Sequence, residues 1–299
     1  MVGRDPTAGR QHRRPRAAPV GSLAVTAAPS RRSERLGTEL LTNLTLRELR
    51  GKYKRSALGW TWSVLNPIVT IAVYALVFSR FLRTEPPIGD PSGRNAYVLF
   101  LVAALLPWTF LANSMTAATS AYTQNDSLVT KVWFPRVMLP VSVTLGWLIT
   151  FVIEMLVALV IFAMVDPKVL VFALALPVLI AIEGVIVVSV SVMVAIANVY
   201  ARDTEHIVRL ATNLWFWVTP VIWPPSLVPR DEIMFGVPIG VIVRCNPMWY
   251  VAEAFRDLLY DLRLPSATTW AALLATAIVT AGLAVVVHRR YEPRLAEEL

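Results

Sequence analysis

The sequence contains little charge and few residues that hold metals or form disulfides. Only 16% of its 299 residues are Asp, Glu, Lys or Arg, whereas 56% are hydrophobic. Soluble domains carry roughly 25% charged residues, so much of this chain is predicted not to face water. Cys245 is the only cysteine, which excludes an internal disulfide and a cysteine-based zinc site. The three histidines, His12, His206 and His288, lie far apart in the sequence, which disfavours a histidine metal site.

The chain also lacks the sequence pattern of an ATP-binding loop. No G-x-x-x-x-G-K-[ST] run is present, so a process driven by ATP would need an ATPase in a separate chain. The net charge of +8 does not indicate nucleic acid, because 13 of the 28 Lys and Arg residues lie in the first 55 positions. Residues 1–35 are rich in Arg, Pro and Ala without an apolar period, and we expect them to form a disordered basic cytosolic arm.

Long apolar runs make up most of the remaining sequence. A helix that crosses a membrane needs roughly 20 mostly apolar residues. Six stretches qualify or nearly do: residues 63–82, 96–122, 137–165, 169–200, 207–223 and 268–287. Residues 233–243 are apolar too, but they are too short to cross and contain Gly236, Pro238 and Gly240. This composition favours a re-entrant or interfacial segment.

The distribution of basic residues orients these spans. With the N-terminus in the cytosol, the cytosolic segments are the arm, residues 123–136, residues 201–206 and the tail from His288, and they hold most of the Lys and Arg residues. A seventh span at residues 233–243 would place His288, Arg289 and Arg290 outside, against the positive-inside rule. The sequence therefore predicts an all-α protein of the cytoplasmic membrane with six transmembrane helices and both termini in the cytosol.

A basic amphipathic segment precedes the first span. Leu36, Leu40 and Leu44 recur at a helical spacing, which is typical of a helix that lies in the inner membrane interface. Five basic residues follow: Arg47, Arg50, Lys52, Lys54 and Arg55. The alternative is a plain basic stop before a span, but the length of the apolar stripe favours the interface helix.

Three of the predicted spans carry polar residues at helical spacing. They are Asn66, Thr70 and Tyr74 in the first span, Thr109, Asn113, Thr116 and Ser120 in the second, and Arg209, Asn213 and Trp217 in the fifth. Residues with these spacings share one helix face. Polar faces are unfavourable in lipid, so these stripes are expected to point into the bundle or into a watery cavity. Ordinary hydrogen bonding between helices would explain one such stripe, whereas three together favour a polar pathway.

The third and fourth spans are almost wholly apolar but hold one acid each, Glu154 and Glu183. A carboxyl group at midmembrane is a functional candidate, for example in a proton relay. Neither helix has Lys, Arg or His at a matching depth, which favours a structural role for both acids.

Two short cytosolic loops have helix-capping residues. Residues 125–135 begin with Asn and Asp, which can cap a short helix, and Pro135 ends it. Leu128, Val129 and Trp133 belong to an apolar stripe that would be exposed unless it meets another protein. The second loop, residues 202–206, likewise starts with a capping acid. Resting on the membrane surface is the alternative for both loops.

Several motifs occur together in a recognisable order. They are RELRGKYKRSALGW at residues 47–60, LNP at 65–67, KVWFPR at 131–136, YARD at 200–203, VTPVIW at 218–223, NPM at 246–248 and AFRD at 254–257. In this order they resemble the signature of ABC-2 type polysaccharide exporter permeases, the membrane subunits that export O-antigen, teichoic acid or galactan. The resemblance covers residues 36–294 as one transmembrane domain and leaves 295–299 as a cytosolic tail.

The resemblance implies a homodimer that binds two copies of a separate nucleotide-binding subunit. ATP and Mg²⁺ would bind that subunit, and the chain itself would hold no cofactor, perform no catalysis and bind no nucleic acid. The dimer would form a channel for a polysaccharide linked to a polyprenyl pyrophosphate lipid. Residues 224–257 would fold back into the outer leaflet as short re-entrant helices between the fifth and sixth spans.

The same resemblance assigns roles to the residues already singled out. Channel residues would be Asn66, Thr70, Tyr74, Thr109, Asn113, Thr116, Asn213 and Trp217. The lipid-pyrophosphate gate would be Arg47, Arg50, Lys52, Lys54 and Arg55. Contacts with the ATPase would come from Asp126, Leu128, Lys131, Trp133, Phe134, Asp203, Glu205 and His206.

Other classes of protein stay open at this point. An ABC-2 permease for a drug or a simple lipid would use the same fold with a more apolar cavity. A membrane-embedded transferase would need clustered acids or a metal pair near one membrane face, which the isolated Glu154 and Glu183 do not supply. A secondary transporter would require Glu154 or Glu183 and no ATPase.

Overall fold

The computed structural model describes residues 31–53, 59–81, 87–131, 134–228, 233–234, 236–295 and 297–299. The chain divides into two units, Met1–Thr38 and Glu39–Leu299. In the first unit, only the start of the first helix is described. That helix begins at Arg31, inside the segment predicted as a disordered arm, and the rest of the arm lies outside the described residues.

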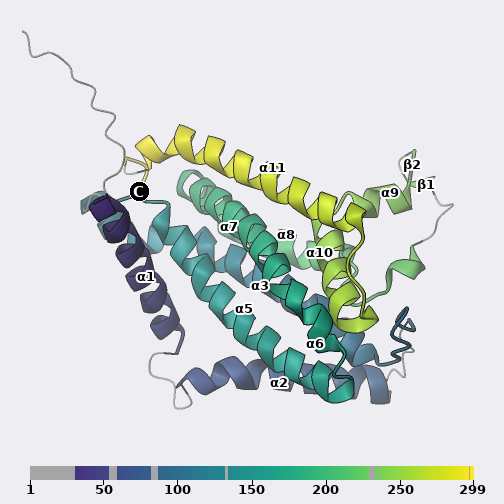
Figure 1. Cartoon of the computed structure of the whole chain (residues 1–299). Helices are drawn as coiled ribbons and strands as arrows, with labels where there is room; N and C mark the ends of the chain where they lie inside the picture. The colour runs from purple at the N-terminus through teal and green to yellow at the C-terminus, as the bar shows by residue number, and fades with distance from the viewer. Residues whose placement is uncertain are drawn as a thin grey trace, which may run out of the picture. The chain divides into compact units, whose positions relative to one another are not determined.

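Helices account for nearly all of the described residues (Figure 1). The α-helices are α1 (Arg31–Tyr53), α2 (Trp62–Ala75), α3 (Tyr97–Thr119), α4 (Asp126–Lys131), α5 (Met138–Val165), α6 (Val169–Phe172), α7 (Leu176–Tyr200), α8 (Thr204–Val218), α9 (Ile239–Arg244), α10 (Pro247–Arg256) and α11 (Ala267–Tyr291). Two π-helical segments, η2 (Leu76–Phe81) and η6 (Asp257–Asp261), continue α2 and α10. Single 3₁₀ turns are η1 (Gly59–Thr61), η3 (Thr123–Asn125), η4 (Ala173–Ala175), η5 (Pro225–Leu227) and η7 (Glu292–Arg294).

Helix α3 is the central element of the fold. Of its 18 most apolar consecutive residues 78% are buried, compared with 17% in the last long helix. It packs against α2, α5, α7, α8 and α10, and α7 packs in turn against α5 and α11 (Figure 1). The small residues Ala103 and Ala104 are fully buried, which lets neighbouring helices approach closely, as is usual between helices in membranes.

Four helical stretches are long and apolar enough to cross a membrane: Tyr97–Thr119, Met138–Val165, Val169–Tyr200 and Ala267–Arg294. They confirm the second, third, fourth and sixth predicted spans. Most of their ends lie within a few residues of the predicted ones. The fourth is built from α6, the 3₁₀ turn η4 and α7. The protein is therefore a multi-pass membrane protein.

The first and fifth predicted spans are shorter than expected. The first corresponds to α2 and its π-helical continuation, in which the apolar helical part is Ile68–Phe78. The fifth corresponds to α8, whose 15 residues end at Val218 just before Thr219 and Pro220. A helix of that length rises about 22 Å, less than the roughly 30 Å of a hydrocarbon core. The count of six spans therefore stays a prediction.

The segment between α8 and α11 does not form a further long helix. Strands β1 (Ile233–Met234) and β2 (Val237–Pro238) pair as a two-residue antiparallel ladder, with Ile233 opposite Pro238. Gly236 has φ of +78° in the turn between them, a left-handed conformation that glycine adopts without a steric penalty. Helices α9 and α10 follow, so the stretch predicted as re-entrant is broken into short elements, and its depth in the membrane stays a prediction.

A second hydrophobic cluster lies apart from the main core. It combines Leu44 of α1, Val129 of α4, Ile196 of α7 and Leu295 after α11. Leu40 packs against the same cluster. Two leucines of the predicted interface helix, Leu40 and Leu44, therefore pack against the protein's own residues, while the side chain of Leu36 lies outside the described residues. Contact of this helix with lipid stays a prediction.

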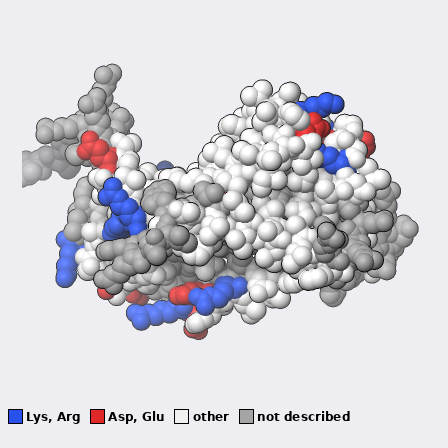
Figure 2. Space-filling view, turned by 90° about the horizontal axis from the view of Figure 1, so that it is seen from below, with Lys and Arg blue, Asp and Glu red and all other residues white. Residues whose placement is uncertain are grey.

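Charged residues are scarce along the four long helices. Helix α3 has none, α5 has only Glu154, α7 has only Glu183, and the basic residues of α11 lie in its last turn. On the face shown in Figure 2, Lys, Arg, Asp and Glu gather at the left, along the lower edge and at the upper right, and a broad white surface lies between the lower and upper groups. This distribution matches a protein whose middle is surrounded by lipid.

The close packing of α3 makes a testable prediction. The variant Ala103→Leu adds three carbon atoms at a site that is 0% exposed, and we expect it to destabilise the protein by about 1–3 kcal/mol. The exposed Ala275 of α11 offers a matched control, and Ala275→Leu should change stability by less than about 0.5 kcal/mol. Unfolding in mixed detergent micelles measures both variants. Equal stability of the two would show that α3 is not tightly packed.

Candidate functional site

Helix α3 is open along one narrow stripe, and that stripe is polar. After Val98, every residue of the helix is buried except Thr109, Ala112, Asn113, Thr116 and Ala117. The three polar members are the channel residues that the sequence placed on one face, so their shared orientation is confirmed. An apolar helix that leaves its polar side uncovered exposes that side to water, substrate or a partner, because lipid contact would be unfavourable.

The polar side chains on the α3 stripe differ in how many of their hydrogen-bonding atoms remain unpaired. The hydroxyls of Thr109 and Thr116 donate to the carbonyls of Leu106 and Ala112 at 2.8 Å, within their own helix. Asn113 is exposed, and its side-chain amide has no hydrogen-bond partner among the described residues. Its amide can both donate to and accept from a hydroxyl-rich ligand.

Helix α8 has three distinct sides. Val208 and Thr212 are buried, and Trp215 and Phe216 contact Trp108 of α3 at ring-centroid distances of 5.6 and 5.7 Å. A polar side carries His206, Arg209, Asn213 and Trp217, with Trp217 62% exposed. An apolar side carries Ile207, Leu210, Leu214 and Val218, all exposed. The packed pair α3 and α8 therefore carries two polar stripes that the chain itself does not cover.

Helix α2 contributes less to this polar surface. Thr70 is exposed, but Ile68, Val69 and Val73 around it are exposed as well. Tyr74 is half-buried and stacks with Phe78, whose ring lies 4.6 Å from that of Tyr97. The side chain of Asn66 lies outside the described residues.

The basic gate residues do not form one open patch. Arg47 donates to the side-chain oxygen of Asn125 at 2.9 Å and pairs with Glu48 at 3.2 Å. Lys52 lies 3.2 Å from the centre of the Trp147 ring and donates to Thr150 at 3.2 Å. Arg50 is exposed and has no hydrogen bond or ion pair among the described residues. Lys54 and Arg55 lie outside the described residues.

Lys52 is turned into the protein against α5. Burial lowers the pKa of its ammonium group to about 7, and the negative charges of Glu154 and Glu48 oppose that shift. The long helices offer no basic residue at the depth of Glu154, and the sequence pattern alone gives no sign that Lys52 lies near it. The residue that supplies the positive charge comes from α1.

Glu183 has no such partner. Its side chain is 1% exposed, and neither carboxyl oxygen has a hydrogen-bond partner among the described residues. The hydroxyls of Ser114 and Ser191 also lack partners there. Nothing in this arrangement connects Glu183 to a chain of titratable groups.

The predicted ATPase contacts are partly used inside the protein. Phe134 is 9% exposed and belongs to the second hydrophobic cluster, and Leu128 packs against that cluster. Asp126, Lys131, Asp203 and His206 are exposed. Glu205 pairs with Arg209 at 3.0 Å. Trp133 lies outside the described residues.

A buried polar network joins α8 and α10 on the side predicted to face outward. Asn246 caps α10 by accepting from the Met248 N–H at 3.0 Å, and it also accepts from the Trp215 indole at 2.8 Å. Its amide donates to the Thr219 hydroxyl at 2.9 Å. In the sequence analysis Asn246 appears only as part of the NPM motif. An Asn-Pro pair before an apolar run is, however, a recognisable helix-cap signal.

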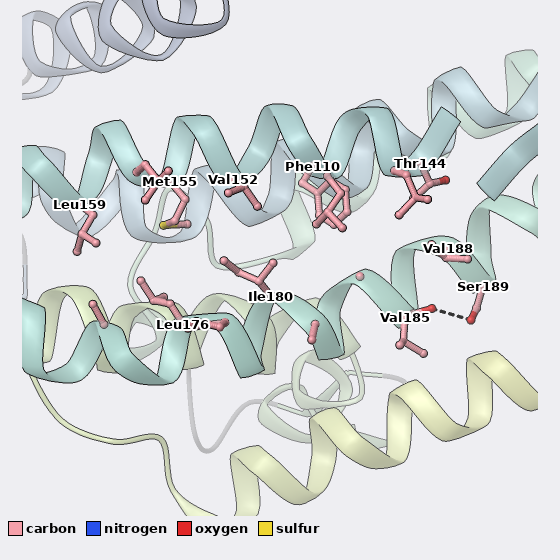
Figure 3. A pocket seen from close by; sticks show the side chains of 17 residues that line it. Phe110, Thr144, Val152, Met155, Leu159, Leu176, Ile180, Val185, Val188 and Ser189 are labelled. Carbon is pink, nitrogen blue, oxygen red and sulfur yellow. Dashed lines mark hydrogen bonds between the residues drawn. The ribbon is translucent and has the colours of Figure 1, made fainter. Parts of the chain in front are cut away.

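A cavity with a volume of about 680 Å³ lies between α5 and α7. Met155 and Leu159 on α5 face Leu176 and Ile180 on α7 across it (Figure 3). The only polar side chains in its lining are Thr144 and Ser189, whose hydroxyls bond to carbonyls of their own helices. None of the predicted channel residues lines this cavity.

Comparison with known proteins agrees with the helical arrangement and the motifs. The family model of ABC-2 type transporters matches residues 39–260. The chain belongs to this family. An O-antigen export system permease protein RfbA from Myxococcus xanthus is 30% identical over 260 residues, which cover 87% of this chain and 95% of that protein. A protein of the same name from Klebsiella pneumoniae is 26% identical over 263 residues, with 87% and 95% covered.

The Asn246 network makes a prediction about the ABC-2 fold of this chain. Asn246→Ala removes a helix cap and two side-chain hydrogen bonds, and we expect it to lower the free energy of unfolding by about 2–4 kcal/mol. The exposed Asn113 provides a matched control, since Asn113→Ala should change stability by less than about 0.5 kcal/mol. Unfolding in mixed micelles compares the two variants. A small loss for Asn246→Ala would mean that water replaces its partners easily.

Proposed function

We propose that this chain is the membrane subunit of an ATP-driven exporter that moves a polyprenyl-pyrophosphate-linked polysaccharide across the cytoplasmic membrane. The observation that carries the proposal is the polar stripe on α3, the only open side of the most buried helix. Sugar hydroxyls bond to amides and hydroxyls of this kind. The printed names of the relatives, O-antigen export permeases, support the same class of cargo; a galactan or teichoic-acid polymer fits the chemistry equally.

The proposed topology has six spans with both termini in the cytosol. Helix α2 with η2 and helix α8 with the turn to Trp223 would complete the count of spans. No described side chain of α2 and η2 is buried, and α8 has exposed residues on two of its sides, as expected for elements that complete their burial against another molecule. The basic last turn of α11 lies on the cytosolic side in this arrangement.

A second copy of the chain is the proposed partner for the exposed apolar surfaces. On α8, Ile207, Leu210 and Leu214 are each about 60% exposed, beside the polar stripe. On α2, Val69 and Val73 are about half exposed. Packing of these sides in a homodimer would leave the polar stripes to line a channel between the two copies.

Coupling to a separate ATPase is proposed for the cytosolic loops. Asp126 and Lys131 of α4, with Asp203 and His206 before α8, are exposed and available for contact with two nucleotide-binding subunits that carry ATP and Mg²⁺. Because Arg47 donates to Asn125 beside α4, motion of that loop would be transmitted to the basic end of α1.

The gate for the lipid pyrophosphate is proposed to centre on Arg50. Arg47 and Lys52 already have partners within the chain, whereas Arg50 is exposed and unpaired among the described residues. A guanidinium group pairs with phosphate oxygens through two parallel hydrogen bonds, which an ammonium group cannot do.

The second candidate function is export of a drug or a simple lipid. The apolar cavity between α5 and α7 favours it, because its size falls within the usual range of about 300–1,000 Å³ for pockets that hold such molecules. In that case the polar stripes on α3 and α8 would be dispensable.

Replacing polar residues of the α3 and α8 stripes distinguishes polysaccharide export from export of a drug or simple lipid. In a host that makes the lipid-linked polymer, Asn113→Leu combined with Asn213→Leu should lower polymer export by about ten-fold or more, since two lost hydrogen bonds are together worth about 1–3 kcal/mol. Thr280→Leu, on α11, is a polar-to-apolar control that should leave export unchanged. Surface polymer and protein level are measured together. Normal export by the double variant would favour the drug or lipid exporter.

The gate makes a separate prediction. Arg50→Ala should reduce export by about ten-fold or more, because a hydrogen bond to a charged group is worth about 1.5–3 kcal/mol, and Arg50→Lys should restore only part of it. The exposed Arg244, on the predicted outer side, is a control whose alanine variant should retain export. Small and equal losses at Arg47, Arg50 and Lys52 would instead indicate a general electrostatic anchor on anionic lipid.

A further inference from the structure

A small charged pocket lies where α10 passes into η6, on the side of the protein predicted to face outward. Its volume is about 250 Å³, and its walls come from the loop before α3, the Pro224–Pro225 turn and the α10–η6 segment. Six of the lining side chains are charged: Asp90, Glu253, Arg256, Asp257, Asp261 and Arg263. Neither the polar stripes nor the gate residues take part in it.

Arg256 is the buried base of this pocket. Its side chain is 4% exposed, and its Nε and Nη2 atoms donate to the carbonyls of Phe100 and Val221 at 3.3 and 2.7 Å. Burial lowers its pKa to about 9, so the guanidinium stays charged at neutral pH. The Nη1 atom has no acceptor among the described residues. That atom is itself buried, and the guanidinium lies 3.7 Å from the centre of the Phe100 ring, so Arg256 contributes a fixed positive charge to the base of the pocket.

The carboxylates of the pocket are only partly occupied by the protein. Asp257 Oδ1 accepts from Arg263 at 2.7 Å, and Glu253 Oε2 accepts from the Trp249 indole at 3.1 Å. The other oxygen of each carboxylate has no donor in the part of the chain that the structure describes. Burial also raises the pKa of Asp257 to about 6. Arg263 is half exposed, and only its Nε and Nη2 atoms are paired with carboxylates of the described residues. The pocket therefore presents one free donor on Arg263 and at least two free acceptors.

The charges that line the pocket disfavour anions, amines and metal ions as ligands. Four carboxylates and two guanidinium groups leave a net charge of −2, which repels a phosphate or another anion. An amine or a metal ion would meet Arg256 and Arg263, and the described residues contain no cluster of three metal-ligating side chains. A hydroxyl group both donates and accepts, so a neutral polyol satisfies both kinds of free group.

We propose that this pocket binds one neutral sugar ring. A volume of about 250 Å³ lies below the range of about 300–1,000 Å³ for drug-sized ligands and suits a single ring. This inference rests on the proposed function in one respect, because the exported polysaccharide would supply the ring. A ring held on the outer side would oppose backward sliding of the emerging polymer.

Binding is tested on the purified full chain without ATPase or nucleotide, by saturation-transfer NMR. The probes are galactose, glucose and N-acetylglucosamine, with glucuronate and glucosamine as charged counterparts. Ser226 lines the pocket and is exposed, so Ser226→Trp fills the space without removing a charge. Thr268→Trp, on the exposed start of α11, is the matched control. We expect transfer to a neutral sugar in the wild-type chain and the control, and at least a five-fold smaller signal in Ser226→Trp.

A second variant tests the hydrogen bonding without adding bulk. Glu253→Gln keeps an oxygen for the Trp249 indole but replaces the free acceptor with a donor, so the sugar signal should fall, while Glu298→Gln at the exposed chain end should not change it. Absence of transfer to every neutral sugar would overturn the proposal. Equal signals in Ser226→Trp and Thr268→Trp would also overturn it, as would stronger transfer to glucuronate or glucosamine.

Polymer export is measured separately in cells, so the two proposals fail independently. Normal export of polysaccharide with no sugar binding by the purified chain removes the pocket assignment and leaves the exporter function in place. Sugar binding that Ser226→Trp abolishes, in a chain that exports no polysaccharide, removes the exporter function and leaves the pocket assignment in place.

Discussion

The burial of α3 on every side but one is the constraint on which the rest of the structure depends. Five other helices pack against it, and the polar residues Thr109, Asn113 and Thr116 lie along the side that is left open. A helix in this position cannot turn to hide that stripe, because rotation would drive polar groups into the core and apolar groups out of it. The position of α8 follows from α3 through Trp108 and its two aromatic partners. The polar surface is therefore fixed by apolar packing behind it.

The end of the fold around η6 is held by buried polar groups instead. Arg94 bonds to backbone carbonyls of Leu259 and Asp166, and Arg256 bonds to those of Phe100 and Val221. Short broken elements leave many backbone carbonyls without helical partners, and each one needs a donor when it is buried. Arginine suits this role because it offers several donors in a fixed geometry. The irregular segment between α8 and α11 is stable for this reason.

Hydropathy alone was sufficient to predict four long helices, since lipid requires an apolar run of defined length. The helical period likewise placed Asn113 with Thr109 and Thr116 on one side. The length of α8 was overestimated, because apolar residues continue past Val218 while the helix ends before Pro220. Composition could not show that Lys52 turns toward Trp147 or that Arg256 is buried, since both depend on neighbours far away in the sequence. Basic residues just before a span are expected to face lipid headgroups, and among the described gate residues only Arg50 is free of hydrogen bonds and ion pairs to other described residues.

The residues that pack on the leucines of α1 are synthesised long after α1 itself. Leu40 and Leu44 are synthesised early, but the residues that bury them come from α4, from the end of α7 and from Leu295, four positions before the last residue. During translation the leucine stripe has no protein surface to rest on. The membrane interface is the nearest apolar surface for a nascent amphipathic helix. The second hydrophobic cluster can therefore close only after Leu295 has been synthesised, and until then the leucine stripe of α1 lacks part of its protein cover.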